Sequence, residues 1–109
     1  MKFRSLAIAG LFAVSASVAV PLLAEGDPAA GKNKTAMCAG CHGIPGFRTA
    51  YPEIYQVPKL GGQNPGYIVA ALKAYKTGAR NHATMKAIAS SLTEQDMADL
   101  AAYYADASK

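Results

Sequence analysis

The segment 65–77, "PGYIVAALKAYKT", alternates apolar and polar residues with the period of an amphipathic helix. Ile68, Leu72 and Tyr75 fall on one stripe at helical spacing. Asn64 precedes the stripe as an N-cap and Gly78 follows it as a stop signal. The pattern therefore predicts one amphipathic helix that buries the stripe.

Similar signals predict three more helices, and no stretch shows the alternation of a strand. They are residues 28–39 after the N-cap Asp27, a short helix from Met85 that buries Ile88 and Leu92, and a last helix after the N-cap Thr93. The last helix buries Met97, Leu100, Ala101 and Tyr104. Gly31 inside the first helix weakens it, which indicates close approach of another helix. We predict an all-α domain of about four helices.

Residues 43–63 do not fit this helical pattern. They contain three prolines and four glycines without a sustained period. A structureless loop of about 20 residues is unusual in so small a domain, yet this loop is too apolar for a disordered linker. Its large apolar residues are Phe47, Tyr51, Ile54, Tyr55, Val57 and Leu60. The loop needs an apolar object to wrap around, and the chain offers little.

The N-terminal residues 1–24 have the layout of a secretory signal peptide. Lys2 and Arg4 precede an apolar run that extends to about Val20, and small residues follow it. The run is short for a spanning helix, although an uncleaved anchor is the alternative. Cleavage after Ala24 leaves a domain of residues 25–109, and cleavage after Ala19 also satisfies the small-residue rule. A chain of about 85 residues usually needs a disulfide, a metal or a cofactor for stability.

Both cysteines of the chain lie in the sequence "CAGCH", as Cys38 and Cys41, and His42 follows directly. C-x-x-C-H is the pattern of covalent haem c attachment. On a helical turn two thiols three residues apart share a face, so both can reach the two vinyl groups on one porphyrin edge. The next residue can then bring its imidazole to the iron. Haem would also supply the apolar object missing from the loop, lined by Phe47, Tyr51, Tyr55 and Leu60.

Three other interpretations of this motif fit the sequence less well. A thioredoxin-like redox pair requires a βαβ context, and no strand is predicted before the motif. A zinc site requires four ligands, whereas Cys41 and His42 are adjacent and His82 stands alone. A disulfide across so short a loop would add little stability. Covalent haem is the reading that we adopt.

The sixth iron position has four candidate residues. Met37 adjoins Cys38 and cannot cross to the other face of the ring, and Met97 lies on the buried stripe of the last helix. His82 fits a surface position, although it stays a candidate, as does an open iron site. Met85 lies 43 residues after His42, beyond the helix stop at Gly78, so the chain can return over the opposite haem face. We predict Met85 as the distal ligand.

The chain resembles a small bacterial class I cytochrome c, similar to the single domains of two-haem periplasmic cytochromes. The resemblance rests on "AAGKNKTAMCAGCHG", "VPKLGGQNPGYIVAALKAYKTGAR" and "MKAIASSLTEQDMADLAAYYAD", in this order. It implies the class I cytochrome c fold around one haem c, since only one C-x-x-C-H is present. It also implies thioethers from Cys38 and Cys41, iron ligation by His42 and Met85, and a Pro58 carbonyl that accepts a hydrogen bond from His42. Gly31 matches the small residue where the first helix crosses the last, near Tyr103 or Tyr104.

The predicted function is that of a mono-haem electron carrier in the periplasm, and not an enzyme. The alternative is a haem c subunit of a larger dehydrogenase or oxidase complex, and a gas or peroxide site with Met85 unbound is a third possibility. Expected partners are donor and acceptor redox proteins, such as a cytochrome complex, a terminal oxidase or a dehydrogenase. The carrier would act as a monomer, without stable membrane insertion once the signal is removed.

Charge adds a little to this prediction. The net charge is +4, and +2 without Lys2 and Arg4, which is too weak to indicate nucleic acid binding. Basic residues gather in the middle of the chain, and acidic residues gather near its end. The basic set is Arg48, Lys59, Lys73, Lys76, Arg80 and Lys86, and the acidic set is Glu94, Asp96, Asp99 and Asp106. A mildly basic rim around the haem would steer the protein toward an acidic partner.

Overall fold

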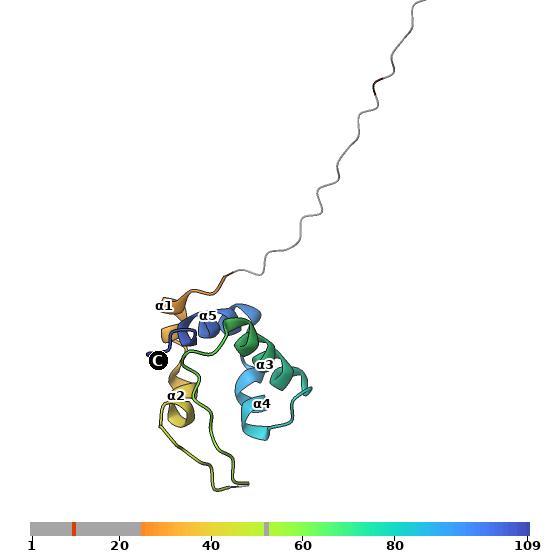
Figure 1. Ribbon diagram of the computed structural model, residues 1–109. Coiled ribbons are helices and arrows are strands. Elements are labelled where there is room, and N and C mark those ends of the chain that lie inside the picture. The colour runs from red at the N-terminus through yellow and green to blue at the C-terminus, as the bar shows by residue number, and fades with distance from the viewer. Residues whose placement is uncertain (1–9, 11–24, 52) are drawn as a thin grey trace, which may run out of the picture.

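The computed structural model describes residue 10 and residues 25–51 and 53–109, and the predicted signal peptide lies almost wholly outside them. The described residues form five helices and contain no strand (Figure 1). The helices are α1 (Pro28–Lys32), α2 (Ala36–His42), α3 (Pro65–Thr77), α4 (Ala83–Ser90) and α5 (Glu94–Tyr104). Within the described ranges, no helix has the length and apolar character to cross a bilayer.

The helix predicted over 28–39 is two helices, so that prediction was wrong in this detail. The Asp27 carboxylate accepts a hydrogen bond from the Ala29 N–H, and α1 ends at Lys32. A turn over 33–35 follows, in which the Thr35 hydroxyl donates to the Lys32 carbonyl. The turn aims the Lys34 side chain at α5, and α2 then begins at Ala36.

The other helix ends follow the local signals. The Asn64 side chain accepts from the Tyr67 N–H at the start of α3, and Gly78 ends α3 in the left-handed region with φ 86°. Thr93 and Asp96 form a reciprocal capping box at the start of α5. Helix α4 begins at Ala83, two residues before the predicted start, because the His82 side chain caps it.

Helix α5 is the centre of the packing, and both α1 and α3 contact it (Figure 1). Gly31 is buried where α1 crosses α5, and a Cβ there would overlap the Asp99 carbonyl and crowd Tyr103. The close approach expected at this glycine is therefore present. Among the described residues the buried apolar side chains are few: Ile68, Ala89, Met97, Leu100, Ala101 and Tyr104.

The loop 43–63 is partly folded back on itself. The Thr49 N–H donates to the Tyr55 carbonyl and the Val57 N–H donates to the Phe47 carbonyl, at 2.9 and 3.0 Å. The backbone pairing makes an arm of residues 47–51 and 53–57 and leaves Tyr51 at its tip, 89% exposed. Tyr51 was expected to line an apolar pocket, and that expectation was wrong because the tip of the arm points into solvent.

Asp99 is a buried carboxylate on α5 that ties two segments, the start of α1 and the turn after it, to this helix. It accepts from Lys34 Nζ at 2.5 Å, from the Asp27 N–H at 2.9 Å and from Gln95 Nε2 at 2.8 Å. These donors, Lys34 first, lower the pKa of Asp99 from 3.8 to about 2. Asp99 is one of the acidic residues near the end of the chain, but it is only 3% exposed and belongs to the interior.

The lowered pKa of Asp99 predicts a stability change in acid. The ionised carboxylate stabilises the fold fully above its unfolded pKa of 3.8, and this contribution disappears as the pH falls to about 2. Asp99→Asn should therefore lower the urea midpoint of the holoprotein at pH 6, and the difference from wild type should vanish near pH 2. A difference that stays constant between pH 6 and pH 2 would show that the carboxylate charge is not the cause.

Candidate functional site

A cavity of about 650 Å³ opens between α2 on one side and α3 and α4 on the other. Its remaining walls are formed by the arm, by the segment that follows the arm, and by α5. Its volume lies in the range of small-molecule and cofactor sites. Aliphatic side chains dominate several walls, namely Val57, Leu60, Ile68, Leu72, Ile88, Leu92 and Leu100.

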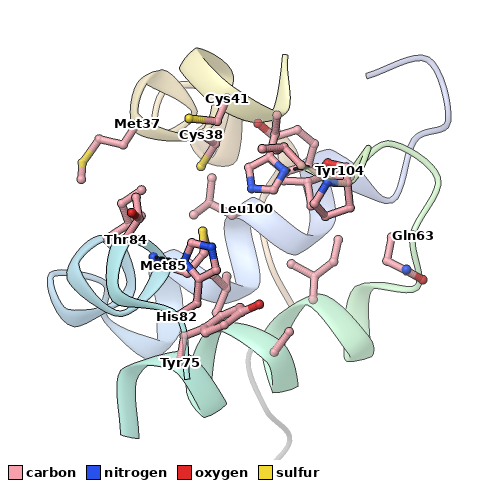
Figure 2. A pocket seen from close by; sticks show the side chains of 18 of the residues that line it. Met37, Cys38, Cys41, Gln63, Tyr75, His82, Thr84, Met85, Leu100 and Tyr104 are labelled. Atoms are coloured by element: carbon pink, nitrogen blue, oxygen red, sulfur yellow. Dashed lines mark hydrogen bonds between the residues drawn. The ribbon is translucent and has the colours of Figure 1, made fainter. Parts of the chain in front are cut away.

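Both cysteines project from α2 into this cavity as free thiols (Figure 2). They lie within one short helix, three residues apart, as the motif predicts. Burial raises the pKa of the Cys38 thiol, which therefore stays protonated at neutral pH. The Tyr104 hydroxyl lies beside this thiol, and burial together with Cys38 raises the pKa of Tyr104 to about 12.

His42 is the last residue of α2 and lines the same cavity. Its Nδ1 lies 2.7 Å from the Pro58 carbonyl oxygen. A carbonyl only accepts hydrogen bonds, so Nδ1 carries the proton and Nε2 keeps a free lone pair. The Gly62 N–H donates to the Tyr104 carbonyl at 2.8 Å, which anchors the segment after Pro58 to α5. The chain thus fixes both the tautomer and the position of His42.

Met85 lies on α4, on the wall that faces α2. In Figure 2 the Cys38 and Cys41 sulfurs project from one wall, Met85 and His82 project from the opposite wall, and Leu100 lies between them. The structure therefore brings the motif of residues 38–42 and Met85 to opposite sides of one cavity.

His82 also lines the cavity, next to Met85. Its Nδ1 accepts a hydrogen bond from the Met85 N–H at 3.3 Å. A neutral imidazole that accepts at Nδ1 carries its proton on Nε2. In this arrangement the Nε2 of His82 has no lone pair to offer a metal, in contrast to the Nε2 of His42.

The other two sulfur candidates lie elsewhere. Met97 is 1% exposed in the core on α5 and does not line the cavity. Met37 is 56% exposed at the edge of the cavity, on the same helix as Cys38. Of the methionines in the described residues, Met85 alone lies on the wall opposite the thiols.

Of the loop residues expected to line an apolar pocket, Tyr55 and Leu60 do so, whereas Phe47 and Tyr51 do not. Phe47 is half-buried at the base of the arm, outside the cavity. Tyr67 and Tyr104 are among the lining residues that the sequence did not predict. The Tyr67 hydroxyl accepts a hydrogen bond from Arg80 at 3.5 Å. Tyr104 had been assigned to core packing, and no local signal shows that its hydroxyl reaches Cys38.

The basic rim predicted around the cavity is partial. Lys59 and Arg80 line the cavity, whereas Lys73 forms an ion pair with Glu94 at 3.0 Å. Lys76 donates to the Leu92 carbonyl at 2.5 Å, which ties α3 to the end of the α4 segment. Lys73 therefore has its charge paired with a carboxylate, whereas Lys59, Lys76 and Arg80 donate to uncharged oxygens.

The donor set fits a covalent haem. Two free thiols and an imidazole with an available Nε2 share one side of an apolar cavity, and a thioether faces them. These are the groups that c-type haem requires for attachment and for His/Met ligation. Within residues 25–51 and 53–109, no group of three or more His, Cys, Asp or Glu side chains gathers at one point as a metal site would require.

Comparison with known proteins places the chain in a family. The family described as Cytochrome c matches residues 28–107. The chain is 44% identical over 82 residues to cytochrome c-554(548) of Halomonas halodenitrificans, covering 72% of this chain and 94% of the relative. It is 30% identical over 98 residues to the cytochrome subunit of sulfide dehydrogenase of Chlorobaculum tepidum, covering 90% and 84%.

A solved structure gives the same result for the fold. The cytochrome c4 structure from Acidithiobacillus ferrooxidans matches with a TM-score of 0.53 and 29% identity. The match covers 75% of this chain and 51% of that one, so the chain spans about half the length of that cytochrome. The predicted all-α, class I cytochrome c fold is confirmed. The chain belongs to the cytochrome c family.

Proposed function

We propose that the cavity holds one haem c and that the protein is a mono-haem electron carrier of the periplasm. Haem c, when bound, supplies an iron that gains and loses one electron. The observation that carries the proposal is the placement of the Cys38 and Cys41 thiols and of His42 across one apolar cavity from Met85. Membership of the cytochrome c family supports it.

Each residue has a distinct role in this proposal. Cys38 and Cys41 would form the thioethers to the vinyl groups, and His42 would bind the iron through Nε2. The Pro58 carbonyl accepts a hydrogen bond from the His42 Nδ1–H, with 2.7 Å between the oxygen and Nδ1. This bond orients the ring and raises the basicity of the ligating nitrogen. Met85 would supply the distal ligand from α4.

The hydrogen bonds argue for Met85 over His82 as the distal ligand. His82 accepts the Met85 N–H at Nδ1, so its proton lies on Nε2. Ligation through Nε2 would require that the proton move and that this hydrogen bond break. Met85 requires neither change, because its thioether has no proton.

Ligation by both His42 and Met85 leaves no open position for a substrate, which favours electron transfer over catalysis. His/Met ligation also raises the reduction potential. The export pattern of residues 1–24 supports a periplasmic location for such a carrier. Lys59 and Arg80 at the cavity would favour a partner with an acidic docking surface.

Electrochemistry of the purified holoprotein, combined with carbon monoxide, tests this function. We expect one reversible one-electron wave, and we expect the reduced protein to keep its spectrum when mixed with carbon monoxide, because Met85 occupies the iron. Rapid carbon monoxide binding by the unmodified protein would contradict the carrier function and favour a gas or peroxide site.

A second candidate is the electron-transfer subunit of a larger dehydrogenase or oxidase. The relative from Chlorobaculum tepidum is such a subunit of sulfide dehydrogenase, and the match covers 90% of this chain. Purification under native conditions separates the two candidates: a free carrier elutes alone, and a subunit elutes with a catalytic chain.

A further inference from the structure

We propose that His82 is a positioning residue for Met85, which it holds by capping the first turn of α4. The inference rests on the proposed ligation by Met85. It concerns how firmly this ligand is presented to the cavity, and it assigns His82 a role other than that of iron ligand or surface residue.

His82 accepts two hydrogen bonds from the first turn of α4, one of them from Met85 itself. The His82 Nδ1 accepts from the Met85 N–H at 3.3 Å, and the His82 carbonyl accepts from the Lys86 N–H at 2.8 Å. The backbone of His82 is extended, with φ −158° and ψ 111°, as expected at an N-cap. Met85 therefore lies in the first helical turn, where its own backbone N–H has no helical acceptor and depends on the cap.

The ring of His82 is itself held by two aromatic residues. The centroid of the Tyr55 ring lies 4.4 Å from that of His82, with a tilt of 48° between the ring planes. The Tyr75 ring meets the His82 ring edge-on, with 6.3 Å between the centroids. Tyr55 is fixed by its neighbours in the arm, since its hydroxyl donates to Glu53 at 2.7 Å and its N–H donates to Thr49 at 2.9 Å. These contacts keep Nδ1 aimed at Met85.

The consequence concerns the equilibrium between bound and released Met85. Without the acceptor at position 82 the first turn of α4 should fray, and released Met85 should become more populated. The loss of an N-cap side chain corresponds to roughly a two- to thirtyfold change in a helix equilibrium. An external ligand that competes with Met85 for the iron should then bind more tightly by a similar factor.

The test measures imidazole binding to the ferric holoprotein. Its variants distinguish the effect of the aromatic ring at position 82 from the effect of the hydrogen-bond acceptor. His82→Phe keeps an aromatic ring and removes the acceptor, so we expect imidazole to bind about fivefold more tightly. His82→Asn keeps an acceptor suited to an N-cap, so we expect binding within about twofold of wild type. The weakening of the ferric absorption band from the sulfur–iron bond should follow the same order.

A matched control removes an equivalent cap from a helix without a proposed iron ligand. The Asn64 side chain accepts from the Tyr67 N–H at 3.2 Å at the start of α3. Asn64→Ala should lower the thermal stability and leave imidazole affinity unchanged. Equal affinities for wild type and His82→Phe would overturn the proposal, as would equal tightening by His82→Asn and His82→Phe, or by Asn64→Ala.

An error in the proposed ligation by Met85 would give a different experimental result from an error in the role of His82. If Met85 does not bind the iron, the wild-type protein lacks the sulfur–iron band, and Met85→Ala binds imidazole no more tightly than wild type. If only the role of His82 is wrong, both of these Met85 signatures are present and the His82 variants have no effect on them.

Discussion

Removal of haem is expected to unfold most of this chain. The apolar side chains of Leu60, Leu72, Ile88 and Leu92 line the cavity and would face water in the haem-free protein. These side chains are half-buried without haem, so haem supplies only part of the about 6–12 kcal/mol that full burial of four such side chains contributes. That part is still a substantial share of the stability of about 5–15 kcal/mol for a domain. The small core on α5 cannot replace this contribution.

Far-UV circular dichroism measures this effect. The chain expressed without the haem attachment machinery should lose most of its helical signal and show no cooperative thermal transition, whereas the holoprotein prepared in parallel should show both. Native helix content with a cooperative transition in the haem-free chain would mean that the cavity is not completed by a cofactor.

Replacement of Met85 is the second change with a large expected effect. Met85→His should give bis-histidine ligation, abolish the sulfur–iron absorption band, and lower the reduction potential by on the order of 100 mV, within the ~0.8 V that axial ligands span. Met85→Ala should instead open the iron, so that the reduced protein binds carbon monoxide. Optical spectra and a redox titration measure both outcomes.

Met97→Leu is the matched control for this experiment, because Met97 is 1% exposed in the core and lies outside the cavity. It should leave the spectrum and the potential unchanged. An unchanged band in Met85→His, or loss of the band in Met97→Leu, would show that Met85 is not the ligand.

Much of the helical fold could be predicted because its signals are local. Asn64, Gly78 and Thr93 mark helix ends through contacts within a few residues, and the structure places the ends of α3 and the start of α5 there. The break between α1 and α2 has another origin. It accompanies the contact of Lys34 with Asp99, 65 residues away, and no local pattern reports such a contact.

The candidate site likewise has one part that local sequence predicts and one part that depends on contacts between distant segments. The thiols and His42 form a contiguous motif that can be read directly, whereas the proximity of Met85 depends on the path of the whole chain. No local pattern reports the hydrogen bond that the His82 side chain accepts from the Met85 N–H, or the contact of Tyr104 with Cys38. Tyr51 was wrongly predicted to line the pocket because it is an apolar residue of the loop. The backbone pairing in the arm leaves it exposed.

The central claim is that Cys38 and Cys41 hold one haem c covalently, and the mass of the acid-denatured protein tests it most directly. Denaturation removes any haem that is bound only through the iron, so a haem that stays must be attached through thioethers. We predict the mass of the polypeptide plus one haem, and the polypeptide mass alone for the double variant Cys38→Ser and Cys41→Ser. A wild-type mass without haem, or lower by two hydrogens as for a disulfide, would contradict the account.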